Sequence, residues 1–502
     1  MELADVPVAV NSPAPAPQQM AREDTPVGPR PRCATAAEAD AWAADWWVAY
    51  EAEASQEKSA HTREMYFEPK ALYALLEPLA DGTPAPVALL RGSYLLRRAD
   101  ELRGRPEAER AAWRLQRRQE LGADAFLTAD EMRGLARGHA GEVFETCLPF
   151  RAAGDKPLKL VSISHGWLTP EHPDPYGEQL VRFADQVRRE RQCCPGGGGD
   201  LARQISGDLC LFGAVDGYCF GVPCVGQRCG DSSKQFPSGE FGVFYDYASL
   251  HQKDEAGVRT RAEIAAFKAA LGSMGVWYAH RLATTYILSE LPEGWPKTEA
   301  ARPFFPQDWL RGKGWPTFER SVSGLVKRST LQSWRRIVDP AVPRGFFGGY
   351  CEPPMHPRAF ARSLALKIFS NGADCEVVAR LYAATLDGAL GNATALEFSE
   401  VGWGDDEAVT FAEVLPLLRS LETLNISRNN IGGRGYGALA AAIRAGAAPR
   451  LKKILHGGER RPTVSSSSAE ELSAWKDAYP QFLEVCIARR IVQQDVFVSN
   501  SK

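Results

Sequence analysis

The 502-residue sequence has no apolar run near the roughly 18 residues that a membrane-spanning helix needs. Its first residues include Glu2 and Asp5, where a secretory signal would carry Lys or Arg. Neither GxGxxG nor GxxxxGK followed by Ser or Thr occurs, so the glycine-rich phosphate-binding loops of these two types are absent. These absences lead us to expect a soluble, cytoplasmic protein that makes no contact with a membrane.

Excess charge and metal-ligand spacing are missing as well. The 59 basic and 62 acidic side chains leave a net charge of −3, which provides no bulk attraction to nucleic acid. The eight histidines never fall at HxxxH spacing, and Cys219, Cys224 and Cys229 recur every five residues without forming a CxxC pair. We therefore expect no metal site and no nucleic-acid partner, and we interpret the eleven cysteines as reduced thiols.

Glycine and proline are clustered, and the clusters indicate boundaries along the chain. At roughly 150 residues per domain, the length predicts about three domains. The predicted regions are a disordered Pro-rich tail at residues 1–35, a helical region at 36–150, an α/β domain at 151–345 with a Gly- and Cys-rich insertion at 193–240, a helical segment at 355–390, leucine-rich repeats at 391–457, and a linker with a C-terminal helix at 458–502.

Short β-type runs alternate with helical periodicity in the centre of the chain. Residues 158–164 (LKLVSIS), 241–246 (FGVFYD) and 284–288 (TTYIL) read as strands, and each is followed by an apolar helical stripe. This alternation predicts an α/β fold with an open parallel sheet. Ligands of such sheets bind beyond the carboxyl ends of the strands, a rule that selects Ser164 and His165 after the first strand, Asp246 after the second, and Ser289 and Glu290 after the third.

Two units with a period of 28 residues follow in the C-terminal part. Residues 421–431 (LETLNISRNNI) match the pattern LxxLxLxxNxI, and residues 393–403 match it with the Asn position lost. We interpret them as leucine-rich repeats that bind protein partners. Two units are fewer than a free-standing solenoid needs, so we expect the block to pack on the preceding helices.

The order of the central motifs resembles that of a divergent Toll/interleukin-1 receptor (TIR) domain, over about residues 158–327. A Ser-rich strand end, an Asp with a following Leu after the second strand, and a Trp-x-x-x-Glu element before a later helix all occur here in the family's order. The matching residues are Ser162, Ser164, Asp246, Leu250, Trp315 and Glu319. Pro316 stands where the family's motif has Cys, and the Gly- and Cys-rich insertion is foreign to the family.

This resemblance implies a flavodoxin-like (TIR-like) sheet, self-association, and cleavage of the nicotinamide glycosidic bond of NAD as substrate, without a cofactor. Glu319 would be the catalytic carboxylate, Trp315 a stacking surface, and Ser164 and Asp246 ligand contacts. A carboxylate that stabilises an oxocarbenium ion is compatible with glycoside chemistry. The implied role is that of a signalling or defence-type protein.

Other readings of the same residues remain open. Asp246 can cap a turn, Glu319 can be a first-turn helix carboxylate, Trp315 can belong to the core, and His165 can be structural. The alternative functions are a non-enzymatic scaffold that binds proteins, and a nucleoside or glycosyl transferase on a related fold. An enzyme should place Glu319 and Asp246 around one open pocket, whereas a scaffold can bury them or pair them with cations.

Overall fold

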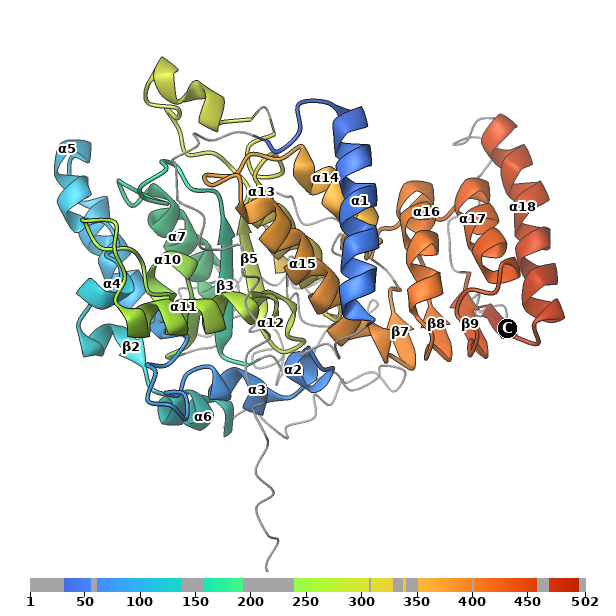
Figure 1. The fold of residues 1–502 in the computed structure, drawn as a ribbon, viewed down its shortest axis with the longest axis horizontal. Coiled ribbons are helices and arrows are strands. Elements are labelled where there is room, and N and C mark those ends of the chain that lie inside the picture. Colours follow the sequence, from blue (N-terminus) through green and yellow to red (C-terminus); the bar gives the residue numbers. More distant parts are fainter. Residues whose placement is uncertain are drawn as a thin grey trace, which may run out of the picture.

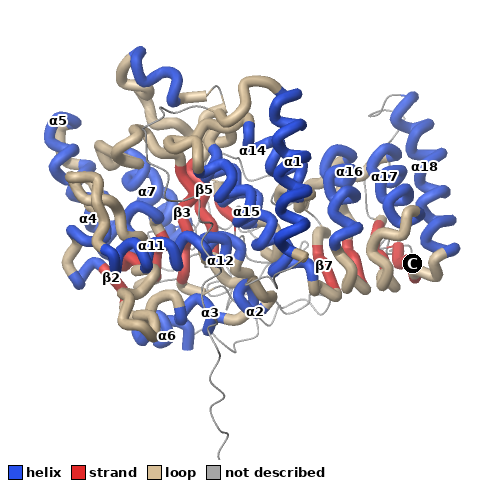
Figure 2. The backbone as a smooth tube through the Cα atoms, viewed as in Figure 1, coloured by secondary structure: helices blue, strands red, loops and turns tan. Residues whose placement is uncertain are grey.

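The protein contains two mostly parallel sheets, both associated with helices (Figure 1). The computed structural model describes residues 31–55, 61–137, 158–192, 239–306, 308–327, 337–339, 351–399, 401–457 and 469–495. The predicted tail up to residue 30, almost all of the predicted insertion at 193–240 and the predicted linker at 458–468 lie outside these residues. Figure 2 shows the strands of each sheet as a separate group among the helices.

The larger sheet has six strands in the order β2-β1-β4-β3-β5-β6. Their bounds are β1 (Leu89–Arg91), β2 (Phe126–Leu127), β3 (Leu160–His165), β4 (Gly242–Phe244), β5 (Thr284–Leu288) and β6 (Ile337–Val338). Strands β4, β3, β5 and β6 are parallel, as the alternating pattern predicts. Numbered among themselves along the chain, these four have the order 2-1-3-4.

One edge of this sheet differs from the prediction. Strand β1 pairs in antiparallel fashion with β2 on one side and with β4 on the other, and both β1 and β2 come from the region at residues 36–150. That region was predicted to be helical throughout, which is wrong for these two strands. Strand β1 depends on its pairing with β4, where Leu90 lies opposite Val243, and β2 in turn depends on β1; no local periodicity encodes these contacts.

Two groups of helices cover the two faces of this sheet. Alternating residues of β3 point to opposite faces, so Val161 and Ile163 pack in the core beneath α4 (Gly92–Arg103) and α7 (Glu178–Gln192). Ser162 and Ser164 face the other way. On that side Ser162 Oγ donates to Trp277 O of α12 (2.7 Å), and α13 and α15 continue the layer.

The remaining helices surround these layers. Their bounds, with those of α12, α13 and α15, are α1 (Ala36–Ala54), α2 (Glu64–Phe67), α3 (Pro69–Ala74), α5 (Glu107–Arg110), α6 (Ala129–Arg137), α10 (Asp246–Ser249), α11 (Arg261–Gly272), α12 (Met274–Ala279), α13 (Gly314–Ser323), α14 (Pro357–Ala365), α15 (Asp374–Leu386), α16 (Asp405–Val414), α17 (Gly433–Arg444) and α18 (Ala469–Ala488). Short turns of other helical types occupy Ala111–Trp113, Arg118–Glu120, Ala123–Ala125, Glu299–Phe304, Asp387–Gly391 and Leu415–Leu417.

The N-terminal helix ties the start of the described chain to the centre. Thr35 caps α1 by accepting a hydrogen bond from the backbone of Glu38 (3.2 Å), and α1 packs along α14. Just before it, Cys33 is buried and its backbone N–H donates to Ala365 O (2.9 Å). The last residues of the predicted tail therefore belong to the folded core.

The second sheet has the order β10-β9-β8-β7 and is entirely parallel. Its strands are β7 (Ala395–Glu397), β8 (Thr423–Asn425), β9 (Lys453–His456) and β10 (Val492–Asp495), and α16, α17 and α18 lie above them in Figure 1. Leu396 pairs with Leu424, which is the 28-residue period of the sequence. The two predicted units are extended by two further strands that were not predicted.

The Asn of the repeat pattern has a clear structural task. Asn429 is buried, and its side-chain oxygen accepts hydrogen bonds from the backbone N–H groups of Val401 (3.1 Å) and Trp403 (3.2 Å). Its side-chain nitrogen donates to Phe398 O (2.7 Å) and Ile426 O (2.9 Å). One side chain thus satisfies four backbone groups in the turns that follow β7 and β8.

Candidate functional site

The carboxyl ends of β3 and β5 define the position where a ligand is expected. In the order 2-1-3-4 the chain reverses its direction of strand addition between the first and third strands, and crevices form at such switch points. Strand β3 ends with Ser164 and His165, and Asp246 begins α10 just after β4. The structure brings these residues together with Glu319 of α13.

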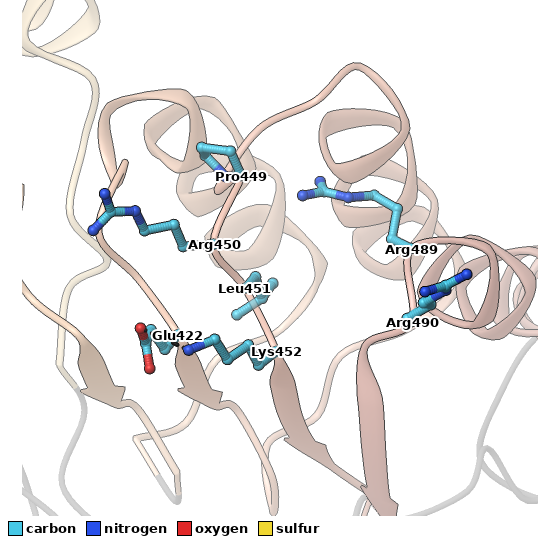
Figure 3. A pocket seen from close by; sticks show the side chains of 7 residues that line it. All are labelled: Glu422, Pro449, Arg450, Leu451, Lys452, Arg489 and Arg490. Carbon is cyan, nitrogen blue, oxygen red and sulfur yellow. Dashed lines mark ion pairs between the residues drawn. The ribbon is translucent and has the colours of Figure 1, made fainter.

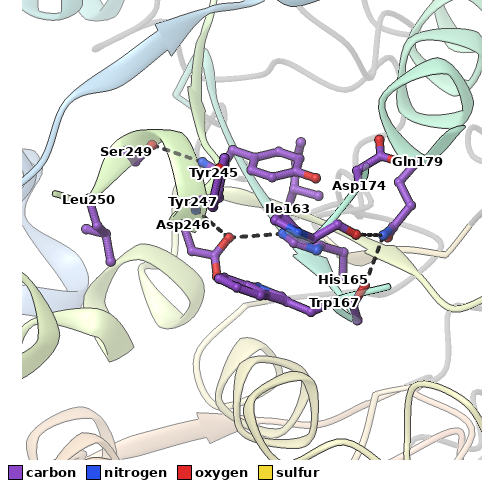
Figure 4. A network of polar contacts seen from close by, with 12 residues as sticks. Ile163, His165, Trp167, Asp174, Gln179, Tyr245, Asp246, Tyr247, Ser249 and Leu250 are labelled. Atoms are coloured by element: carbon purple, nitrogen blue, oxygen red, sulfur yellow. Dashed lines mark hydrogen bonds and ion pairs between the residues drawn. The ribbon is translucent and has the colours of Figure 1, made fainter. Parts of the chain in front are cut away.

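His165 and Asp246 form a buried pair at this edge of the sheet (Figure 4). His165 Nε2 lies 3.0 Å from Asp246 Oδ1, and the ring of Tyr245 stacks on the imidazole at 4.5 Å between centroids. The other Asp246 oxygen accepts from Trp167 Nε1 (3.4 Å), and Oδ1 also accepts from the backbone N–H of Tyr247 (2.6 Å). The carboxylate is therefore both a turn cap and an ion-pair partner.

The pair shifts the proton affinities of both its members. Burial disfavours charge on His165, but the adjacent Asp246 carboxylate outweighs it and raises the pKa of the imidazole. Burial likewise opposes charge on Asp246, and the imidazole together with its hydrogen bonds lowers the pKa of that carboxyl. Both shifts favour an imidazolium next to a carboxylate.

Glu319 is the most perturbed acid of the group. It lies in the second turn of α13, so the alternative interpretation of Glu319 as a carboxylate in the first turn of a helix is wrong. Only 3% of its surface is exposed. Burial raises the pKa of Glu319 to about 8, and the negative charge of Asp246 raises it as well. His165 and the hydroxyls of Ser164 and Tyr278 lower this pKa but do not reverse the shift. Glu319 is therefore mostly protonated at neutral pH.

Several polar atoms around Glu319 have no hydrogen bond. They are Glu319 Oε2, Ser164 Oγ and His165 Nδ1, and all are buried. Ser164 lies close enough to Glu319 to affect its pKa, yet the two side chains do not reach hydrogen-bonding geometry. Buried polar atoms in folded proteins nearly always have partners, so this group of unpartnered atoms marks a place where a polar ligand or water can bind.

Asp174 is a third acid near His165, and it is not among the site residues predicted from the sequence. Burial raises the pKa of Asp174 to about 6, although its Oδ2 accepts from Leu180 N (2.9 Å). Its Oδ1 is buried without a hydrogen bond. The signal in the sequence is the segment HPDP, whose flanking prolines suggest a rigid exposed loop rather than a buried one.

The neighbouring His172 is structural. Its Nε2 pairs with Leu115 O (2.9 Å), and its Nδ1 accepts from the backbone N–H of Asp174 (2.9 Å). Burial lowers the pKa of His172 to about 4, so the ring is neutral at pH 7. It holds the loop that carries Asp174.

Aromatic side chains cover the strand ends. Trp309 packs against Gly166, where a Cβ atom would come within 2.6 Å of its indole ring, and Phe305 stacks on Trp309 at 4.9 Å. Lys313 is also buried here, with its amine 2.9 Å from the centre of the Phe304 ring. Aromatic rings therefore cover the edge of the sheet beyond Gly166 and limit the access of solvent, which strengthens the electrostatic effects among the acids nearby.

Trp315 is not part of this group. Its Nε1 donates to Asp374 Oδ2 of α15 (2.9 Å), and its ring meets Phe318 edge to face at 6.1 Å. These contacts anchor the start of α13 to α15. The structure thus brings Ser164, Asp246 and Glu319 together and places Trp315 elsewhere.

The two cavities described in the protein lie away from Glu319. One, of about 440 Å³, lies at the end of β5 and is lined by residues that include Arg182, Ser289 and Glu290. The other, of about 510 Å³, belongs to the second sheet. Neither is lined by Glu319 or Asp246, and Asp246 keeps 20% of its side chain exposed.

Comparisons of the chain with protein-family models, with curated proteins and with solved structures found no match. Among the described residues, no helix combines the length and apolar character needed to cross a membrane. The same residues contain no group of three or more His, Cys, Asp or Glu side chains suited to hold a metal ion. The cysteines considered as metal ligands, Cys219, Cys224 and Cys229, lie outside the described part of the chain.

Proposed function

We propose that the larger sheet with its helices is a TIR-like, flavodoxin-like domain that cleaves the nicotinamide glycosidic bond of NAD, with Glu319 as the acid at the reacting carbon. The observation that carries the proposal is the group of buried, unpartnered polar atoms on Glu319 and Ser164 beside the His165–Asp246 pair. The strand order 2-1-3-4 supports it, because ligands of such sheets bind at this switch point.

The proposed reaction is a hydrolysis. The bond between ribose C1′ and the nicotinamide nitrogen breaks, its electron pair leaves with neutral nicotinamide, and C1′ becomes an oxocarbenium ion. Water then forms the new C1′–O bond and loses one proton, so the products are ADP-ribose, nicotinamide and a proton. A carboxylate next to C1′ stabilises the cation, as in glycoside hydrolysis.

The protonation states of Glu319 and Asp246 are compatible with these reaction steps. Glu319 is mostly neutral at pH 7, so its burial costs little free energy. A cationic nicotinamide riboside placed beside it lowers its pKa, so Glu319 releases its proton to water when the substrate binds and takes a proton back when the products leave. Asp246 retains its charge through His165 and is the nearby acceptor for the proton of the attacking water.

A non-enzymatic scaffold is the second candidate, and a specific observation favours it. Glu319 lines neither described cavity, and Asp246 is paired with His165, as expected of a domain that only makes protein contacts. In that case the repeats at residues 391–457 would bind protein partners, and the TIR-like domain would associate with copies of itself.

The two candidates are separated by nicotinamide release. Purified protein is incubated with NAD over a range of protein concentrations, because self-association can alter access to a buried site, and nicotinamide is measured by chromatography. We expect release by the wild type and a loss of at least 100-fold in Glu319→Gln, about 3 kcal/mol of lost transition-state stabilisation. Glu413→Gln, at an exposed position of α16, is the matched control.

The scaffold function follows if the wild type releases no nicotinamide at any concentration. If Glu319→Gln and the control release nicotinamide at equal rates, the assignment of Glu319 as the catalytic acid is wrong. A thermal melt of each variant checks that a lost rate does not reflect unfolding.

A further inference from the structure

The second sheet carries a cavity of about 510 Å³ next to the loops that lead into its last strands (Figure 3). Four of its lining residues are cations, namely Arg450, Lys452, Arg489 and Arg490, and the only carboxylate is that of Glu422. The whole chain has a net charge of −3, so this local excess of positive charge does not follow from the composition. The functions proposed above do not depend on this positive charge.

Two of the four cations already have partners. Lys452 Nζ lies 2.9 Å from Glu422, and Figure 3 shows the amine directed toward that carboxylate. Arg489 donates to the carbonyl groups at the end of α17, to Ile443 O (2.9 Å), Ala447 O (2.7 Å) and Ala448 O (3.1 Å). Arg489 thereby holds the end of α17 against the end of α18.

The other two cations are free. Within the part of the chain that the structure describes, the guanidinium groups of Arg450 and Arg490 form no hydrogen bond and no ion pair. Each side chain is exposed. An unpaired guanidinium presents five N–H donors in a planar fork, which matches the oxygens of a phosphate group.

The backbone conformation at Arg490 is fixed by the end of α18. Arg490 has φ of 56°, in the left-handed region that favours glycine, and the following N–H of Ile491 donates back to Cys486 O (2.8 Å). This is the geometry that ends many helices, normally with glycine at the left-handed position. Here an arginine occupies the position, at the rim of the cavity.

We propose that this cavity binds a small ligand carrying two or more phosphate groups. Arg450 and Arg490 supply the free guanidinium groups from opposite sides of the lining in Figure 3, so each binds a different phosphate group, and Pro449 and Leu451 between them supply apolar contact surface. The volume of about 510 Å³ falls within the range of small-molecule sites. Because the lining comes from the ends of both α17 and α18, the bound ligand links the last two units of the sheet.

Inorganic tripolyphosphate is the probe. Its binding to the full-length protein is measured by calorimetry, with the rise in Tm as a second readout. Sodium sulfate at equal ionic strength tests whether charge alone suffices, and a phosphoserine peptide tests whether the phosphate must come from a protein. We expect saturable binding of tripolyphosphate, and weaker or no binding of the other two.

Arg450→Gln and Arg490→Gln should each weaken the binding about tenfold, the effect of losing hydrogen bonds between charged groups. Arg450→Lys, which keeps the charge but loses the fork, should fall between Arg450→Gln and the wild type. Arg434→Gln is the control, since Arg434 lies at the opposite end of α17 and pairs with Asp406. Circular dichroism confirms that each variant is folded.

The proposal is overturned if both Gln variants bind tripolyphosphate as the wild type does, or if sulfate binds equally well. It is also overturned if only the phosphopeptide binds, because the site would then serve a protein partner. Nicotinamide release from NAD should be unchanged in Arg450→Gln, so the outcome at this cavity is independent of the function proposed for the larger sheet.

Discussion

His165 Nε2 lies 3.0 Å from Asp246 Oδ1, so the last residue of β3 and the first residue of α10 form one ion pair across the ends of two neighbouring strands. Glu319 lies near the same pair, yet its pKa moves in the opposite direction from that of Asp246. Two acids whose environments separate their pKa values in this way are suited to different tasks in one reaction. In the reaction proposed above, the charged one is the proton acceptor, and the neutral one ionises in response to the cationic substrate.

Replacement of Asp246 by Asn should lower the pKa of His165 below its ordinary value, because burial is then opposed only by the smaller effects of Glu319 and Asp174. In the wild type a raised pKa means that His165 contributes stability below about pH 6.5, and that this stability is lost as the pH rises through the folded-state value. The variant should therefore be less stable than the wild type by about 3 kcal/mol at pH 6. An NMR titration of the imidazole together with urea unfolding measures both effects.

Asp130→Asn is the control for this change, since Asp130 is an exposed residue in the first turn of α6. It should leave the titration of His165 unaltered. An unchanged pKa of His165 in Asp246→Asn would contradict the assignment of the ion pair.

Glu319→Gln should change how stability depends on pH. The folded protein holds the Glu319 proton up to about pH 8, whereas the unfolded chain releases it near pH 4.5, so wild-type stability falls as the pH rises between these values. Relative to Glu319→Gln, the wild type should lose about 3 kcal/mol between pH 5 and pH 8, at about 1.4 kcal/mol per pH unit. Urea unfolding at several pH values checks this, and parallel curves for the two proteins would refute a raised pKa.

Local patterns predict the centre of the fold well. The TTYIL segment predicts β5 at Thr284–Leu288, its observed bounds, because five β-type residues stand together before the polar Ser289 and Glu290. The same reasoning selects Ser164 and Asp246, since residues at the carboxyl ends of adjacent parallel strands must lie near each other. Glu319 joined them through the resemblance of its motif, and the structure places it beside both.

Long-range contacts account for what the sequence did not predict. Strands β1 and β9 have only three and four residues, and each depends on hydrogen bonds to strands distant in the sequence. Trp315 was expected at the ligand, but its indole pairs with Asp374, 59 residues further along the chain. Asp174 is buried only because the loop that carries it folds back toward Leu115 and Tyr245.

Asn429→Ala tests the repeat turn that joins the second sheet. The substitution removes four hydrogen bonds at once and leaves the N–H groups of Val401 and Trp403 buried without acceptors. Each unsatisfied buried group costs about 1–3 kcal/mol, so we expect the free energy of unfolding to fall by about 3 kcal/mol. Asn430→Ala is the matched control, because Asn430 is exposed and bonds to Trp403 O through its backbone. A loss below about 0.5 kcal/mol, the usual range for surface substitutions, would show that Asn429 does not hold the turns of β7 and β8 together.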